Sequence, residues 1–71
     1  MEKSTFTKKL GNQIAKLREK EGLTQLELAK SLKNRKQNIS RLELGAINPS
    51  AFFLHELSKA LKVPMAKLFE F

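Results

Sequence analysis

The sequence contains no cysteine, aspartate, tryptophan or tyrosine, and it has only one histidine. Without cysteine the chain has no disulfide and no thiolate metal site, so the packing of apolar side chains must stabilise the fold. One histidine and no aspartate provide little material for a catalytic or metal site. We therefore expect a protein that is not an enzyme and needs no metal or cofactor, with His55 on a polar helix face.

Long apolar runs are also missing. No stretch reaches the length of about 20 apolar residues that crosses a bilayer, and residues 1–9 lack the apolar centre of a signal peptide. We expect a soluble, cytoplasmic protein without a membrane partner. Its 71 residues suffice for a single domain. So short a chain buries only about 60% of the surface that its unfolded form exposes.

Positive charge, in contrast, is abundant and unevenly placed. The formal charge is +7; residues 1–41 carry eleven Lys or Arg and four Glu, whereas residues 42–71 carry three of each. A one-sided positive field attracts a polyanion, either nucleic acid or an anionic membrane surface; a merely solvated basic face is the alternative. A membrane surface would require a helix with a strongly apolar face opposite a basic one. No helix here combines the two well, so nucleic acid is favoured.

Glycine and proline are few and mostly mark breaks between short helices. They occur at Gly22, Gly45, Pro49 and Pro64, and only Gly11 falls inside an apparent helix. Apolar side chains at helical spacing predict helices over about residues 6–21, 25–32, 36–44, 51–61 and 64–69. The first helix is expected to bury Phe6, Leu10, Ile14 and Leu17. Because strand-like alternation is absent, the expected fold is all-α, with five short helices around one core.

The start of the second helix is the best-specified boundary. Thr24 and Glu27 have the spacing of a capping box, in which each side chain accepts from the other residue's backbone amide. The second helix is therefore expected to begin at Gln25.

The third helix carries two different faces. At about 100° per residue, one face holds Ile39, Leu42 and Glu43, and the other holds Lys36, Gln37, Ser40, Arg41 and Leu44. An α-helix fits the major groove of B-DNA, where each base pair presents its own donors, acceptors and methyl groups. Lys36 and Arg41 can donate to guanine, and Gln37 can pair with adenine. Residues from about 24 to 45 therefore predict a helix-turn-helix that binds double-stranded DNA.

Contacts to the DNA backbone are expected around this face. Gln25 lies beside unpaired amides at the amino end of the second helix, where phosphate binds readily, and Asn38 and Ser40 are further candidates. Leu44 lies on the same side and could contact a thymine methyl. The favoured alternative is that Leu44 is simply exposed or packs on the following loop.

Basic residues near the amino terminus add to these candidates. Lys3, Lys8 and Lys9 can contact phosphates, with residues 1–5 as a candidate flexible arm. The alternative is a frayed, solvated end.

Several short motifs occur in a specific order. They are Leu17-Arg18, Gly22-Leu23-Thr24-Gln25, Leu28-Ala29, Ile39-Ser40-Arg41-Leu42-Glu43 with Gly45, Asn48-Pro49-Ser50, Leu57, Ala60-Leu61 and Val63-Pro64. With these motifs and no gap between them, the chain from about Leu10 to Phe69 resembles the phage-repressor type of helix-turn-helix proteins, the Cro-like or Xre-like regulators.

The resemblance implies a lambda-repressor-like fold that usually acts as a dimer on an inverted-repeat operator, with the third helix in the major groove. It places Lys36, Gln37 and Arg41 at base-contacting positions. It gives Gln25 a phosphate contact and the support of the first base-reading side chain. It also implies a structural pair between Arg18 and Glu43.

The turn of the helix-turn-helix departs from the family pattern. The family commonly has glycine, an apolar residue and a small hydroxyl cap where this chain has Lys33, Asn34 and Arg35. Lysine disfavours the left-handed conformation, so Asn34 is expected either to adopt it or to cap the next helix. A shift of one residue would rotate the third helix by about 100°. The order of Lys36 and Gln37 as base readers therefore stays open, and Arg35 becomes a candidate phosphate or base contact.

Three aromatic residues suggest a partner surface in the electrically neutral half of the chain. Phe52, Phe69 and Phe71 are expected at a homodimer interface; alternatively Phe69 is core and Phe71 frayed. The expected role is a transcriptional regulator, either a repressor or a restriction-modification-type controller. The alternative is an antitoxin-type module that neutralises a partner protein and uses DNA binding for autoregulation. The chain ends close to the expected end of the fold, which favours the regulator.

Overall fold

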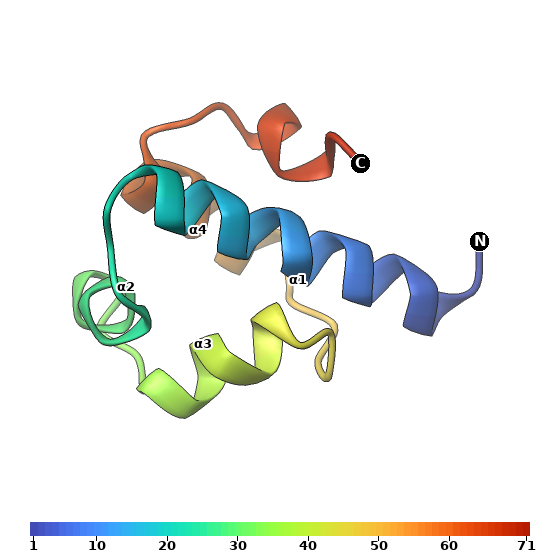
Figure 1. The fold of residues 1–71 in the computed structure, drawn as a ribbon, viewed down its shortest axis with the longest axis horizontal. Helices are drawn as coiled ribbons and strands as arrows, with labels where there is room; N and C mark the ends of the chain where they lie inside the picture. The colour runs from blue at the N-terminus through green and yellow to red at the C-terminus, as the bar shows by residue number, and fades with distance from the viewer.

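The computed structural model describes residues 1–71, which form four α-helices and a final 3₁₀ helix (Figure 1). In chain order these are α1 (Lys3–Lys20), α2 (Gln25–Ser31), α3 (Lys36–Glu43), α4 (Ala51–Leu61) and η1 (Met65–Phe69). The all-α fold and the order of its elements are confirmed. The last predicted helix is a 3₁₀ helix, with Pro64 immediately before it. No helix is both long and apolar enough to cross a bilayer.

Helix α1 begins three residues earlier than the sequence predicts, so the candidate arm over residues 1–5 is helical from Lys3 onward. The amide of Phe6 donates to the carbonyl of Glu2 (2.9 Å). The hydroxyl of Thr7 donates to the carbonyl of Gly45 (3.0 Å). Thr7 is buried, whereas Phe6, which the apolar stripe predicted to be buried, is 36% exposed. A long-range polar contact therefore fixes the first turns of α1, and a count of apolar spacing could not identify it.

The predicted capping box at the start of α2 is confirmed. The amide of Glu27 donates to the Thr24 hydroxyl (3.0 Å), and the Thr24 amide donates to the Glu27 carboxylate (2.8 Å). The hydrogen bond from the Thr24 amide lowers the pKa of the Glu27 carboxyl below its ordinary value. The carboxylate therefore stays ionised beside the amino end of α2, where it also suits the helix dipole.

All four α-helices end in the same backbone motif, in which one residue adopts a left-handed conformation and the next amide reaches back five residues. After α2, for example, the amide of Asn34 donates to the Ala29 carbonyl (2.8 Å) and that of Lys33 to the Lys30 carbonyl (3.1 Å). The left-handed residues are Gly22, Lys33, Gly45 and Lys62. The sequence therefore places glycine at two of these ends and lysine at the other two.

The turn between α2 and α3 consequently differs from the expectation. Lys33, not Asn34, takes the left-handed conformation (φ 53°), because the two backbone hydrogen bonds of the motif outweigh the preference of the lysine side chain. Arg35 occupies the cap position of α3 without a side-chain hydrogen bond. The Asn34 side chain instead accepts from the Arg35 amide (2.8 Å). Helix α3 still begins at Lys36 as predicted, so its faces keep the predicted register.

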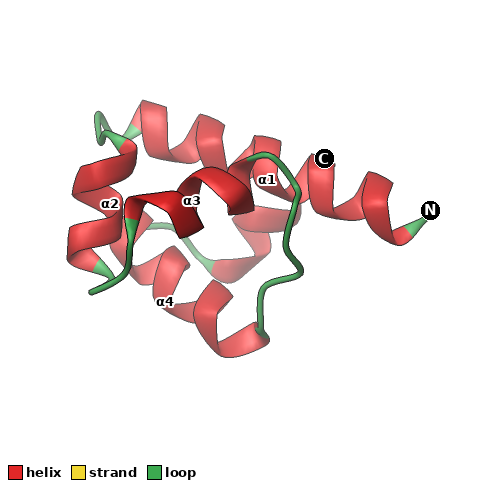
Figure 2. Cartoon of the chain, turned by 90° about the horizontal axis from the view of Figure 1, so that it is seen from below, coloured by secondary structure: helices red, strands yellow, loops and turns green.

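The core joins all five elements. Its eleven buried apolar side chains are Leu10, Ile14, Leu17, Leu28, Ala29, Ile39, Leu42, Leu54, Leu57, Leu61 and Leu68. Helix α1 crosses the middle of the molecule, with α3 on one side and η1 on the other (Figure 1). Seen from below, α3 lies in front of the other helices (Figure 2). The packing therefore leaves one long face of α3 at the surface.

We predict that Lys33→Gly stabilises the protein. It removes the cost of a left-handed lysine, about 1–2 kcal/mol, and adds about 0.4–1 kcal/mol of chain entropy to the unfolded state. The free energy of unfolding from urea denaturation should rise by roughly 0.5–1 kcal/mol, and Lys62→Gly should behave alike. Lys30→Gly, inside α2, should instead lose about 1 kcal/mol. A loss of stability in Lys33→Gly would contradict the left-handed assignment.

Candidate nucleic-acid interface

The outer face of α3 brings the predicted base-contacting residues together. Lys36, Gln37, Ser40 and Arg41 line one shallow hollow of about 350 Å³. Ser40 is half-buried, and the other three side chains are exposed. Neither Lys36 nor Arg41 forms an ion pair with any carboxylate of the chain. The hollow therefore presents two cationic groups without a partner carboxylate, the ammonium of Lys36 and the guanidinium of Arg41, together with a neutral amide and a hydroxyl.

The opposite face of α3 is fixed by a buried ion pair between Arg18 of α1 and Glu43. The Arg18 Nε donates to the Glu43 Oε2 (2.7 Å) and the Nη2 donates to the Oε1 (3.1 Å). Only 12% of the Arg18 side chain and 6% of the Glu43 side chain is exposed. Arg18 also donates to the carbonyl of Leu23 (2.7 Å). This two-pronged pair is of the strong, geometrically specific kind, and its hydrogen bonds raise the pKa of Arg18 above its ordinary value.

Gln25 joins the same group. Its side-chain amide donates to the Glu43 Oε1 (2.8 Å), so the carboxylate engages one of its two side-chain N–H bonds. Gln25 therefore ties the first turn of α2 to the last turn of α3. The sequence predicts a phosphate contact for Gln25 but not its hydrogen bond to Glu43, because that bond depends on how α2 packs against α3.

The other residues around α3 divide between exposed and structural positions. Arg35 is exposed at the start of the helix, and Leu44 is 71% exposed at its end. Asn38 is half-buried, and its side-chain Nδ2 donates to the Oδ1 of Asn34 (2.7 Å). Asn38 therefore stabilises the turn before α3.

The neighbouring lysines of α1 point in different directions. Lys8 packs against the loop after α3: a Cβ atom on Gly45 would lie only 2.6 Å from the Lys8 Cα. Lys9 instead lines a hollow with Glu70 and Phe71, on the side of the carboxyl-terminal segment. Successive helical residues are turned by about 100°. Only Lys8 therefore lies beside the exposed end of α3.

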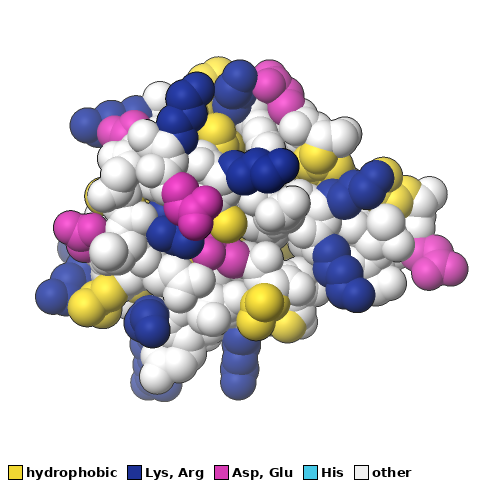
Figure 3. Space-filling model, in the orientation of Figure 1, with side chains coloured by type: hydrophobic (Ala, Val, Ile, Leu, Met, Phe, Trp, Pro, Cys, Tyr) yellow, Lys and Arg dark blue, Asp and Glu magenta, His cyan; other side chains and the backbone are white.

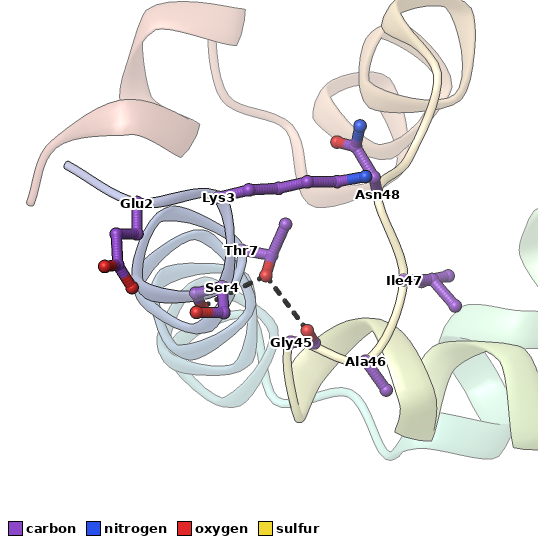
Figure 4. A pocket seen from close by; sticks show the side chains of 8 residues that line it. All are labelled: Glu2, Lys3, Ser4, Thr7, Gly45, Ala46, Ile47 and Asn48. Atoms are coloured by element: carbon purple, nitrogen blue, oxygen red, sulfur yellow. Dashed lines mark hydrogen bonds between the residues drawn. The ribbon is translucent and has the colours of Figure 1, made fainter.

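A second basic side chain lies near the same loop. Lys3 extends toward Asn48 across a hollow of about 520 Å³ between the first turns of α1 and residues 45–48 (Figure 4). Basic side chains also project from the lower edge of the molecule, the edge on which α3 lies (Figure 3). Lys3 and Lys8 therefore add positive charge near the end of α3, beside the basic side chains of the helix itself.

The three aromatic residues assigned to a dimer interface form two separate groups. Phe69 and Phe71 pack against Phe6 of α1, with ring centroids 6.4 and 5.6 Å apart, respectively. Phe52 lies on the first turn of α4, 71% exposed, and its ring is 6.3 Å from that of His55. The alternative that Phe69 is core is wrong, because Phe69 is 40% exposed and Leu68 is the buried residue of η1.

Comparison with known proteins agrees with this geometry. Residues 14–68 match the model of a family described as helix-turn-helix. An uncharacterized HTH-type transcriptional regulator of Sinorhizobium fredii is 39% identical over 61 residues, which cover 86% of this chain and 79% of that protein.

Two solved structures are similar over most of the chain. The restriction-modification controller protein C.AhdI of Aeromonas hydrophila has a TM-score of 0.85 at 28% identity, covering 89% of this chain and 96% of the other. The clp gene regulator ClgR of C. glutamicum has a TM-score of 0.87 at 26% identity, covering 90% and 82%.

We predict that Glu43→Ala strongly destabilises the fold. It leaves the Arg18 guanidinium buried without its carboxylate, which should lower the free energy of unfolding by about 3–5 kcal/mol, measured by urea denaturation. Glu56→Ala is the control, since its carboxylate lies 3.7 Å from Lys59 at the surface and should be worth less than about 1 kcal/mol. Similar losses in the two variants would mean that the buried pair does not hold α3 in place.

Proposed function

Because the chain belongs to the helix-turn-helix family of DNA-binding transcriptional regulators, we propose that α3 is its recognition helix and reads base pairs in the major groove. One observation carries the proposal: Lys36, Gln37, Ser40 and Arg41 share one hollow without a carboxylate among them. Ile39 and Leu42 on the other side are buried, so α3 can offer only this face. Its donors suit the acceptor-rich edges of purines in the major groove.

The base-reading roles follow from the chemistry of the side chains. Arg41 and Lys36 donate to the O6 and N7 atoms of guanine, and Gln37 both donates to and accepts from the edge of adenine. Ser40 and Arg35, at the rim of the face, contact phosphates. Gln25 also contacts a phosphate, through the side-chain N–H that is not bonded to Glu43. These contacts set the register of the protein on the duplex, and the bases supply the specificity.

Backbone contacts on the α1 side belong to Lys8, which lies beside the end of α3, with Lys3 near the following loop. We do not include Lys9 among the proposed DNA contacts, because it lines the hollow with Glu70 and Phe71. Each phosphate neutralised releases counterions, so Lys8 should strengthen binding to every sequence alike.

We further propose that the protein acts as a homodimer on an inverted repeat, with Phe52 at the interface. Phe52 is the most exposed phenylalanine of the chain and lies on α4, the helix that follows α3. A two-fold dimer presents the same patch from both copies and brings two recognition helices to major-groove segments about one turn apart. Of the similar proteins, one is a restriction-modification controller and another a clp gene regulator. This similarity favours a repressor or controller of genes over the antitoxin alternative.

Gln37→Ala and Arg41→Ala should reduce discrimination between DNA sequences. We would select a binding site from random duplexes and compare its affinity with that of an unrelated duplex at one salt concentration. Each substitution should lower the affinity ratio by about 5- to 150-fold, corresponding to the 1–3 kcal/mol of one base contact. Lys30→Ala, outside this face, should leave the ratio unchanged. If both α3 variants keep the wild-type ratio, α3 is not the reader.

Lys8→Ala should weaken binding to all sequences about equally. The slope of log K against log salt should become shallower by about 1, as expected for one lost phosphate contact. Lys9→Ala removes the same charge from the neighbouring position and should leave the slope nearly unchanged. A sequence-selective loss in Lys8→Ala, or equal slopes in the two variants, would refute this assignment.

Phe52→Ser should shift the sedimentation of the free protein from dimer toward monomer. Phe71→Ser, which removes an exposed ring from the other aromatic group, should leave the dimer intact. Circular dichroism would verify that both variants remain folded. A wild-type protein that sediments as a monomer at all concentrations, or a dimer that only Phe71→Ser dissociates, would contradict the proposal.

A further inference from the structure

Three phenylalanines from opposite ends of the chain form an exposed cluster, the aromatic patch, consisting of Phe6, Phe69 and Phe71. The ring of Phe6 stacks against that of Phe69 and meets that of Phe71 edge-on. Each of the three is between 36% and 45% exposed. Exposed aromatic rings gathered in one place are characteristic of surfaces that bind partners.

The patch is held in place by the fold. Leu68, immediately before Phe69, is fully buried in the core. The side-chain amide of Gln13 donates to the carbonyl of Lys67 (2.9 Å) and ties η1 to α1. A partner would therefore meet rings that are already assembled, which lowers the entropic cost of binding.

The rim of the patch is basic. Lys9 and Lys16 line a hollow of about 200 Å³ with Asn12, Gln13, Glu70 and Phe71. The Glu70 carboxylate is paired with the ammonium of Lys67 (3.0 Å), whereas neither Lys9 nor Lys16 is paired with a carboxylate. Phe71 of the patch therefore shares a hollow with two lysines that form no ion pair with a carboxylate of the chain.

The patch lies on the side of α1 away from α3. Helix α1 runs between α3 and the carboxyl-terminal segment (Figure 1). A partner on the patch would therefore leave the proposed DNA-binding face free.

A second copy of this chain fits the patch poorly. In a two-fold interface the same surface faces itself, so the basic rims of the two copies would approach each other. Like charges brought together in this way oppose association. The better match is a surface of opposite charge.

We infer that the aromatic patch and its basic rim dock an acidic segment of another protein, with apolar side chains against the rings and carboxylates at Lys9 and Lys16. Apolar contact and charge complementarity then act on the same short segment. The regulator can hold this partner while α3 is on DNA. The site goes beyond the proposed DNA-binding function and uses none of its residues.

The test uses the full chain and a fluorescein-labelled peptide of twelve residues, in which leucine and phenylalanine alternate with aspartate and glutamate. Two control peptides replace either the acidic residues with their amides or the apolar residues with serine. Fluorescence anisotropy at physiological salt should show binding of the first peptide and at least about fivefold weaker binding of each control. Failure of the first peptide to bind, or equal binding of the serine peptide, would overturn the inference.

Variants locate the site. Phe71→Ser and the double variant Lys9→Ala with Lys16→Ala should each lower the affinity for the peptide by about fivefold or more. The controls Phe52→Ser and Lys8→Ala should change that affinity little. The first two should retain their affinity for DNA, and the peptide should bind equally well to the DNA-bound protein. Unchanged peptide affinity in the patch variants would overturn the proposed site. A loss of DNA affinity in Lys9→Ala with Lys16→Ala as large as that in Lys8→Ala would overturn it too. Loss of DNA binding in the α3 variants alone would bear only on the proposed function.

Discussion

The contact on which the rest of the structure depends is the buried ion pair between Arg18 and Glu43. It joins α1 to the end of α3, and the side-chain amide of Gln25 brings α2 to the same carboxylate. Burying two charges is costly unless their geometry and remaining hydrogen bonds are well satisfied, and no buried side-chain polar atom here lacks a partner. Since Glu43 lies on one face of α3, holding it fixes the rotation of the helix. The outer face, with Gln37 and Arg41, is thereby held outward.

Much of this arrangement is readable from the sequence. The capping box at Thr24 defines the start of α2 by local chemistry, and the helical spacing of Ile39 and Leu42 assigns the inner face of α3. The resemblance to Cro-like regulators supplied the pairing of Arg18 with Glu43, which no local pattern could give. Local signals and the position of the family motifs therefore predicted the order of the helices and the exposed face of α3.

The remaining features depend on contacts between distant parts of the chain. Lys33 is left-handed because the end of α2 requires that conformation, whatever residue is present. Thr7 replaces Phe6 in the buried stripe because its hydroxyl reaches Gly45. The different directions of the neighbouring Lys8 and Lys9 become clear only when α3 and η1 are placed on opposite sides of α1. That placement separates the proposed DNA face from the aromatic patch.

The central claim is that the outer face of α3 reads the major groove. It is tested most directly by replacing each purine of a selected binding site with its 7-deaza analogue, which removes the major-groove N7 acceptor, and each guanine with inosine, which removes only the minor-groove amino group. Wild-type protein should lose about fivefold or more in affinity at one or more 7-deaza positions and little with inosine. Arg41→Ala should no longer respond at the position that Arg41 reads. Sensitivity to inosine without sensitivity to the 7-deaza purines would contradict the account.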